Sequence, residues 1–160
     1  MPDQTAVADI IARNLATVQA HFHNENPTDI DKAIALYDEN ETSWEGPSRG
    51  VVLTSHADVR SAYLDIFKSL KINKMAVLRE FATERFVFHD QVVESEVVEE
   101  LMPNLPYPAG TVMSIRLAHV FELRDGKIVK EIAYEIFRRA GSAQDVDSLP
   151  AGTVWTYFDE

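Results

Sequence analysis

Residues 111–138 read TVMSIRLAHVFELRDGKIVKEIAYEIFR, and this stretch decides the fold. Its first half alternates apolar and polar side chains, as a strand with one buried face does. Asp125-Gly126 then gives the strongest hairpin signal in the chain, because both residue types tolerate the positive φ of a tight two-residue turn. We therefore predict two long antiparallel strands, over about 111–123 and 127–138.

A second β-rich segment precedes this hairpin. Valine and phenylalanine dominate residues 86–98, which favours strands, and the polar run at 89–91 suggests a hairpin turn there. Residues 102–110 contain three prolines, which cannot donate a hydrogen bond to a sheet ladder. We expect this segment to be a loop that is long enough to cover a pocket.

Three helices are expected in the first half of the chain. Apolar residues recur every three or four positions over residues 4–23, which places them on one helix face. Thr28 with Asp31, and Ser55 with Asp58, mark two further helix starts. Because the helices come first and the strands follow, the sequence predicts an α+β domain rather than alternating βαβ units.

The chain of 160 residues, 46% of them hydrophobic, suits a single domain with a sizeable core. We predict an α+β domain over residues 1–140 and a C-terminal extension over 141–160. The extension contains VWTYF at 154–158, which is too apolar and β-prone to be fully solvated. We expect it to dock on a partner subunit.

Charge and composition argue against several classes of function. The net charge of -11 opposes nucleic-acid phosphates and anionic lipid headgroups, so neither is an expected partner. Without cysteine there is no disulfide, no thiolate metal site and no thiol nucleophile. The N-terminus lacks the pattern of a signal peptide and no apolar run reaches about 18 residues, which predicts a soluble cytoplasmic protein.

No metal and no cofactor are expected. The five histidines, at positions 21, 23, 56, 89 and 119, do not show the HExxH spacing of a zinc site. A glycine-rich loop of the kind that cradles phosphate groups is also missing from the sequence.

Four segments carry a family resemblance: residues 29–37, TSWEGP at 42–47, the helix from Ser55, and HVFELRDGKI at 119–128. Together they resemble the nuclear transport factor 2-like superfamily, most closely its SnoaL-like polyketide cyclase and ketosteroid isomerase branches. The resemblance covers roughly residues 5–138. It implies a curved, mostly antiparallel sheet wrapped around three helices into a cone, an apolar pocket at the wide end, and dimerisation through the sheet.

The resemblance also implies two catalytic residues. In the ketosteroid isomerase branch a carboxylate just before a proline moves a proton next to a carbonyl group, and Glu45 matches that position beside Trp44, whose ring could raise the carboxyl pKa. His21 matches the oxyanion-stabilising tyrosine, and a neutral imidazole can donate such a hydrogen bond. The alternatives are a solvent-facing Glu45 at a strand end and a packing histidine at a helix end.

Two positions depart from the family pattern. The second oxyanion donor of the isomerases aligns with Ala118, and the aspartate of the cyclases and epoxide hydrolases aligns with Ala133. If Ala133 faces inward, Glu131 and Glu135 share its face, with Arg116 and Ala118 beside them on the neighbouring strand. An Arg–Glu pair there is either a catalytic couple or a structural salt bridge.

In this register His119 lies on the opposite face from Ala118, and a shift of one residue would exchange the two. We expect six side chains to line the pocket: Trp44, Tyr63, Arg116, Ala118, Glu131 and Glu135.

The sequence leads to one hypothesis with two rivals. The first is a cofactor-independent isomerase, cyclase or dehydratase for a small hydrophobic carbonyl substrate, working as a homodimer with Glu45 as base and His21 as donor. The second is a non-catalytic ligand-binding or scaffold module of the same fold. The third is an epoxide or ester hydrolase, whose water would be held by Glu131, Glu135 and Arg116.

Overall fold

The chain begins with three helices, as expected. In the computed structural model, which describes residues 4–158, they are α1 (Gln4–Asn24), α2 (Ile30–Ile34) and α3 (His56–Ser69). Ser55 caps α3, because its side chain accepts a hydrogen bond from the Asp58 N–H. The start of α2 differs from the prediction: the Asn26 side chain, not that of Thr28, accepts from the backbone N–H groups that follow it. Asparagine favours this local turn, because its side chain reaches the backbone N–H two residues on.

Seven strands form one curved sheet in the order β2-β1-β6-β5-β4-β3-β7. They are β1 (Ser43–Gly46), β2 (Val51–Leu53), β3 (Leu70–Ala82), β4 (Phe86–Val97), β5 (Val112–Arg124), β6 (Lys127–Arg139) and β7 (Thr156–Tyr157), and a 3-10 turn, η1 (Pro47–Arg49), joins β1 to β2. Every pair of neighbours is antiparallel except β1 with β6. The α+β architecture with a mostly antiparallel sheet is therefore confirmed.

The turn between β5 and β6 lies where the sequence predicts it. Asp125 and Gly126 have φ angles of 52° and 79°, the positive values that such a hairpin requires. The turn expected at residues 89–91 is wrong, because these residues lie within β4 and the chain turns earlier, at 83–85. Asp90 fits inside a strand because two arginines, Arg79 and Arg116, pair with its carboxylate.

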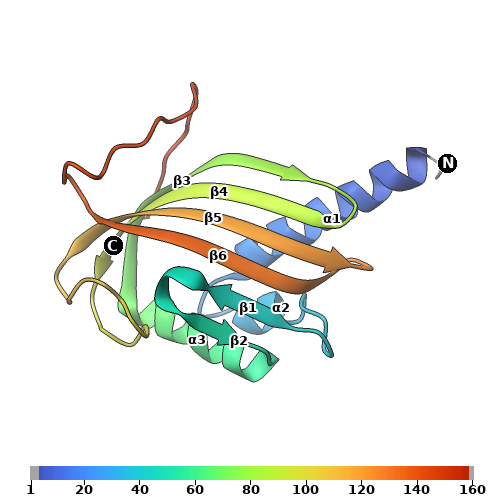
Figure 1. Cartoon of the computed structure of the whole chain (residues 1–160), viewed down its shortest axis with the longest axis horizontal. Coiled ribbons are helices and arrows are strands. Elements are labelled where there is room, and N and C mark those ends of the chain that lie inside the picture. Colours follow the sequence, from blue (N-terminus) through green and yellow to red (C-terminus); the bar gives the residue numbers. More distant parts are fainter. Residues whose placement is uncertain (1–3, 159–160) are drawn as a thin grey trace.

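Figure 1 shows α1 crossing the sheet behind the long strands, while α2 and α3 lie beside β1 and β2. We call the sheet face towards these helices the inner face, and the opposite side the outer face. The core fills the space between the helices and the inner face; its buried apolar members include Val18, Ile30, Ala33, Tyr37, Val59, Phe121 and Ile128. The pairing between strands thus decides which polar side chains enter this core.

Residues 98–111 form the loop between β4 and β5, and the side chains of Ser69 and Asn104 help to hold it. The Ser69 hydroxyl accepts hydrogen bonds from the backbone N–H groups of Leu101 and Met102, both at 3.1 Å. The Asn104 side chain donates to the carbonyl oxygen of Arg49 at 2.6 Å. The loop therefore lies over the end of α3 and over η1.

The C-terminal extension contacts the sheet of its own chain in this structure. Strand β7 pairs with β3 through Thr156 and Tyr157 and forms the edge of the sheet. Asp147 adds ion pairs to Arg138 at 2.7 Å and to Arg116 at 3.1 Å. None of the helices within residues 4–158 is long and apolar enough to cross a membrane.

Candidate active site

A buried carboxyl group, that of Glu131, lies at the centre of the candidate site. It is 1% exposed, and Tyr37 and Tyr63 each donate a hydroxyl hydrogen bond to it, the second at 3.1 Å. His21 Nε2 lies 3.0 Å from the Tyr63 hydroxyl and 3.6 Å from Glu131 Oε2. Because Tyr63 gives its proton to Glu131, its oxygen accepts from the imidazole N–H.

Four elements bring these groups together. Glu131 points inward because it shares the inner face of β6 with Ala133, and period-two alternation sends its neighbours outward. Tyr37 follows α2 and is fixed by a bridge to Ile128 on β6. Tyr63 lies on the buried face of α3, and His21 lies in the last turn of α1.

Burial sets the protonation of the carboxyl groups. It raises the pKa of Glu131 to about 7, and the hydrogen bonds from the two tyrosines prevent a larger rise. The indole N–H of Trp44 lies close enough to lower this pKa as well, although it does not reach hydrogen-bond geometry with the carboxyl group. Burial, together with the charge of Glu131, also raises the pKa of Glu25 well above its usual value. Near pH 7 Glu131 can therefore both take and return a proton.

The neighbouring histidines are neutral. Burial lowers the pKa of His21 to about 4. Burial, and the nearby His89 and His21, lower the pKa of His119 to about 3. Neither imidazole can offer a positive charge to Glu131 at neutral pH, so both act as hydrogen-bonding groups.

A cavity of about 80 Å³ lies beside Glu131. It lies over Ala133, whose small side chain leaves space between Glu131 and Glu135 on the same face of β6. Its wall is mostly apolar and also includes Glu25 and Gln91; the apolar members are Trp44, Tyr63, Ile66, Leu70, Met102, Ile115, Leu117, Ala133 and Phe137. The cavity can thus enclose a small molecule with the carboxyl group at its side.

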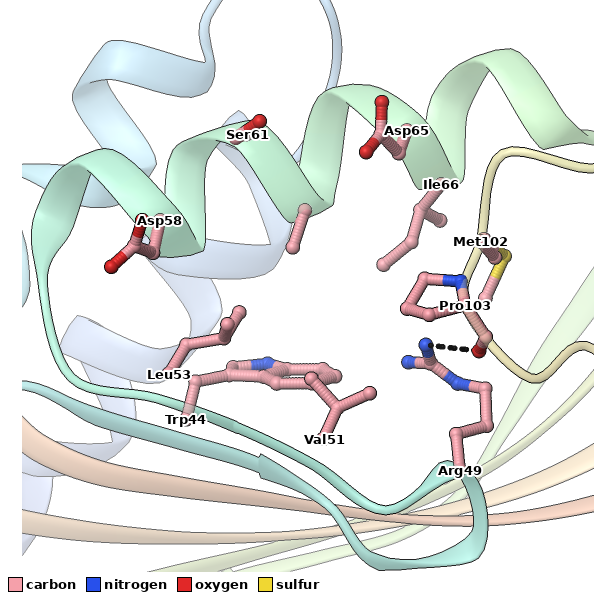
Figure 2. Close-up of a pocket in the computed structure, with 11 residues that line it drawn as sticks. Trp44, Arg49, Val51, Leu53, Asp58, Ser61, Asp65, Ile66, Met102 and Pro103 are labelled. Carbon is pink, nitrogen blue, oxygen red and sulfur yellow. Dashed lines mark hydrogen bonds between the residues drawn. The ribbon is translucent and has the colours of Figure 1, made fainter.

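A second hollow, of about 240 Å³, lies outside this cavity between α3 and the β1–β2 hairpin (Figure 2). The two share Trp44, Ile66 and Met102 as wall residues. We call the first the inner cavity and the second the outer pocket. The three shared side chains form the partition between the two spaces.

A buried ion pair stands at this partition. Arg49 donates two hydrogen bonds to Glu135, at 2.9 and 3.0 Å, in the bidentate geometry that suits guanidinium and carboxylate. Its third contact, to the carbonyl oxygen of Pro103, is marked in Figure 2. Each charge is compensated by the other. This ion pair therefore supports the partition without presenting a free charge.

Glu45 and His21, the pair expected to act together, point to different places. Trp44 enters the core, so its neighbour Glu45 faces the outer side of the sheet. The Glu45 carboxylate pairs with Lys130 at 2.7 Å and is 27% exposed. His21 contacts Glu131 instead. Glu45 lines neither the inner cavity nor the outer pocket.

The register of β5 against β6 differs by one residue from the expected one. His119 pairs with Ala133, and Ala118 pairs with Tyr134. His119 therefore faces the inner cavity, while Ala118 and Arg116 face outward, where Arg116 binds Asp90. The apolar residues of β5 share the face of His119, and burying them against the helices fixes this orientation.

Of the six expected lining residues, Trp44, Tyr63, Glu131 and Glu135 line the inner cavity. Sequence reasoning missed Tyr37, Glu25 and Gln91, which lie far from Glu131 along the chain. Nothing local in the sequence distinguishes the Tyr37 hydroxyl, which reaches a carboxylate on a strand 94 residues away. Within residues 4–158 no group of three or more His, Asp or Glu side chains is arranged to hold a metal ion.

No family model matches the sequence, and no curated protein matches it. Solved structures do match the fold. An NTF2-like protein from Burkholderia xenovorans superimposes with a TM-score of 0.66 at 13% identity, over 79% of this chain and 91% of that one. A candidate polyketide cyclase from Xanthomonas campestris gives 0.62 at 20% identity, over 78% and 91%.

An LEH-like epoxide hydrolase from M. tuberculosis gives a TM-score of 0.60 at 13% identity, over 79% of this chain and 84% of that one. Structural similarity at identities this low shows the fold and does not show the chemistry. The chain has the nuclear transport factor 2-like fold, as the sequence segments indicate.

Proposed function

We propose that this chain is a cofactor-independent enzyme that moves a proton next to the carbonyl group of a small substrate, with Glu131 as the base. The observation that carries this proposal is a buried carboxyl group, with a pKa near 7, in the wall of a small, partly open cavity. A general base works best when its pKa lies near the operating pH. Buried carboxyl groups with such values are concentrated at functional sites.

The surrounding hydroxyl groups suit this role. Tyr37 and Tyr63 stabilise the ionised form of Glu131 through their hydrogen bonds, so the carboxyl group does not stay permanently protonated. His21 takes part through Tyr63, whose hydroxyl it holds towards Glu131. In this proposal His21 is therefore a positioning residue and Glu131 the group that touches substrate.

The volume of the inner cavity limits the reacting part of the substrate. A cavity of roughly 150 Å³ can hold benzene. The inner cavity of about 80 Å³ is about half as large, so it suits a group of three or four heavy atoms. The rest of a longer molecule would extend past Trp44, Ile66 and Met102 into the outer pocket. Isomerisation, cyclisation and dehydration all begin with the removal of such an activated proton.

Hydrogen exchange tests the proposal without knowledge of the natural substrate. The purified protein is incubated in D2O with 2-butanone. Proton NMR follows the loss of signal from the protons on the carbons next to the carbonyl group. We expect exchange above the buffer rate, its absence in Glu131→Gln, and its retention in Glu45→Gln. Equal exchange rates in the wild type and Glu131→Gln would refute Glu131 as the base.

The neighbouring structures are compatible with two other functions. One is described as an LEH-like epoxide hydrolase, yet Ala133 here replaces the aspartate that the hydrolase branch is expected to need. The other is a non-catalytic binding module, and the two tyrosine hydrogen bonds that already engage Glu131 favour it. Saturable binding of 2-butanone without exchange would support the binding module.

We propose further that two copies of the chain associate through the outer face of the sheet. Apolar side chains gather there across four strands: Phe81, Phe88, Val120, Ile132, Tyr134 and Ile136. Tyr134 and Ile136 are 48% and 58% exposed, and contiguous exposed apolar groups of this kind mark interfaces. Light scattering should give twice 18.0 kDa, and Ile136→Lys should reduce it to the monomer mass. A wild-type mass of 18.0 kDa would exclude the dimer.

A further inference from the structure

Four polar atoms in the wall of the inner cavity are buried and unsatisfied. They have no hydrogen-bond partner among the residues that the structure describes, 4–158: Glu25 Oε2, Trp44 Nε1, Gln91 Oε1 and His119 Nδ1. A buried polar atom that stays unpaired destabilises the fold. Four of them around one small cavity indicate that its occupant is polar at more than one point.

Strand pairing places the atoms of Trp44, His119 and Gln91 on different sides of the cavity. Trp44 pairs with Glu131 from β1, on one side of β6. On the other side of β6, His119 of β5 lies opposite Ala133. Gln91 of β4 lies one strand further, about 10 Å from β6 at the usual strand spacing. A ligand over Ala133 therefore lies between an indole N–H and the amide of Gln91.

The chemistry of the three atoms on the strands defines what they can bind. An indole N–H only donates, so Trp44 requires an acceptor such as a carbonyl oxygen. The oxygen of the Gln91 amide requires a donor, and a hydroxyl group supplies one. His119 is neutral, so one of its nitrogens donates and the other accepts, and either can meet a hydroxyl group. The cavity is therefore complementary to a carbonyl and a hydroxyl group within three or four atoms of each other.

We infer that the substrate of this site is a small α-hydroxy carbonyl compound, a hydroxyketone or hydroxyaldehyde, recognised by Trp44 and Gln91 beside Glu131. This inference rests on the proposed function, because it takes Glu131 as the base. It adds the class of substrate, and it assigns the carbonyl oxygen to Trp44 and the hydroxyl group to Gln91.

The reaction that follows is an isomerisation through an enediol. Glu131 takes the proton from the carbon that bears the hydroxyl group, the C–H electron pair forms a carbon–carbon double bond, and the carbonyl oxygen becomes an oxyanion next to the Trp44 N–H. The protonated Glu131 then returns the proton to the former carbonyl carbon, while the hydroxyl proton moves to the other oxygen. The carbonyl group has moved by one carbon, and no oxidant or reductant is consumed.

Two ligands of equal size test the ligand class. Hydroxyacetone and 2-butanone differ only by a hydroxyl group in place of a methyl group. Binding is followed by the indole N–H signal of Trp44 in 15N-labelled protein, with Trp155, the second tryptophan, as internal reference. We expect hydroxyacetone to shift the Trp44 signal and to bind about tenfold more tightly than 2-butanone, since one hydrogen bond is worth about 1.4 kcal/mol.

A variant locates the preference. Gln91→Met keeps the length of the side chain and removes the acceptor, so both ligands should bind it with similar affinity. Gln19→Leu, on the exposed surface of α1, should leave the tenfold preference unchanged. Equal affinities in the wild type, or a Trp44 signal that neither ligand shifts, would overturn the hydroxy carbonyl assignment and leave only water for the unpaired atoms.

Exchange separates this inference from the proposed function. The hydroxymethyl protons of hydroxyacetone should be replaced by deuterium in the wild type, and Glu131→Gln should bind hydroxyacetone without exchange. Preferential binding with no exchange in the wild type would refute Glu131 as the base and keep the ligand class. Exchange of both ketones without preference would keep the base and overturn the ligand class.

Discussion

The raised pKa of Glu131 has a consequence for stability that can be measured without any substrate. The folded protein holds the Glu131 proton more tightly than the unfolded chain does, because burial raises its pKa from 4.5 to about 7. The carboxyl group therefore contributes fully to stability below pH 4.5, and this contribution is lost as the pH rises through 7. Glutamine, which resembles the protonated acid, should not show this loss.

The size of the effect follows from the pKa shift. Between pH 5 and pH 8 the wild type should lose about 2 to 3 kcal/mol that Glu131→Gln retains, at 1.36 kcal/mol for each pKa unit. For a domain of this size each kcal/mol moves the melting temperature by roughly 2–4 °C. We compare the melting temperature of Glu131→Gln with that of the wild type at each pH. We expect the difference in favour of the variant to be about 4–12 °C larger at pH 8 than at pH 5.

The assay is thermal and urea unfolding of both proteins at the two pH values. The stability difference between variant and wild type is compared at the two pH values. This removes any fixed loss of stability from placing an amide between Tyr37 and Tyr63, since that loss is present at both pH values. Glu45→Gln is the matched control: this carboxylate pairs with Lys130 at the outer face, and exposed pairs are worth about 1 kcal/mol or less. If the gain of Glu131→Gln is the same at pH 5 and pH 8, the reasoning about Glu131 fails.

Three further predictions concern the same cavity. Tyr63→Phe removes a hydrogen bond that lowers the pKa of Glu131, so the midpoint of the exchange rate against pH should move above that of the wild type. Buried neutral His21 and His119 should make the protein lose stability as the pH falls from 6.5 towards 4, because the unfolded chain binds their protons first; urea unfolding should show a smaller loss in His119→Gln. Ala133→Leu should fill the inner cavity and abolish the hydroxyacetone shift, while circular dichroism shows the fold unchanged; binding at wild-type affinity would place the ligand elsewhere.

The fold could be predicted because its signals are local. Alternation over residues 111–123 and the Asp125-Gly126 turn each depend on a few neighbouring residues, and the structure confirms both. The sheet face on which Ala118 lies does not depend on neighbouring residues alone. It was inferred from an alignment in which Ala118 faces inward, whereas the apolar residues on the side of His119 gain more from burial, and with period two an error of one residue inverts every side chain.

The candidate site was predicted only in part, for the same reason. Glu131 was expected at the pocket because it shares a face with Ala133. Tyr37 could not be expected there, since its hydroxyl meets Glu131 through the packing of α2 on β6. Glu45 illustrates a limit that the sequence itself imposes: it follows Trp44 on a short strand, and two adjacent strand residues cannot both enter the core.

The cluster around Glu131 places ionisable groups where burial disfavours their charged forms, and this supports a function for it. A protein often stays as stable, or becomes more stable, when apolar side chains of similar volume replace a buried carboxyl group and its polar partners. Here two carboxyl groups, Glu25 and Glu131, have raised pKa values in one core, and His21 and His119 are held neutral beside them. Groups that oppose folding are commonly found where a protein needs them for chemistry, and departures from good packing are expected at functional sites. A pure scaffold would have no use for this arrangement, because an apolar core can hold the same helices on the same sheet.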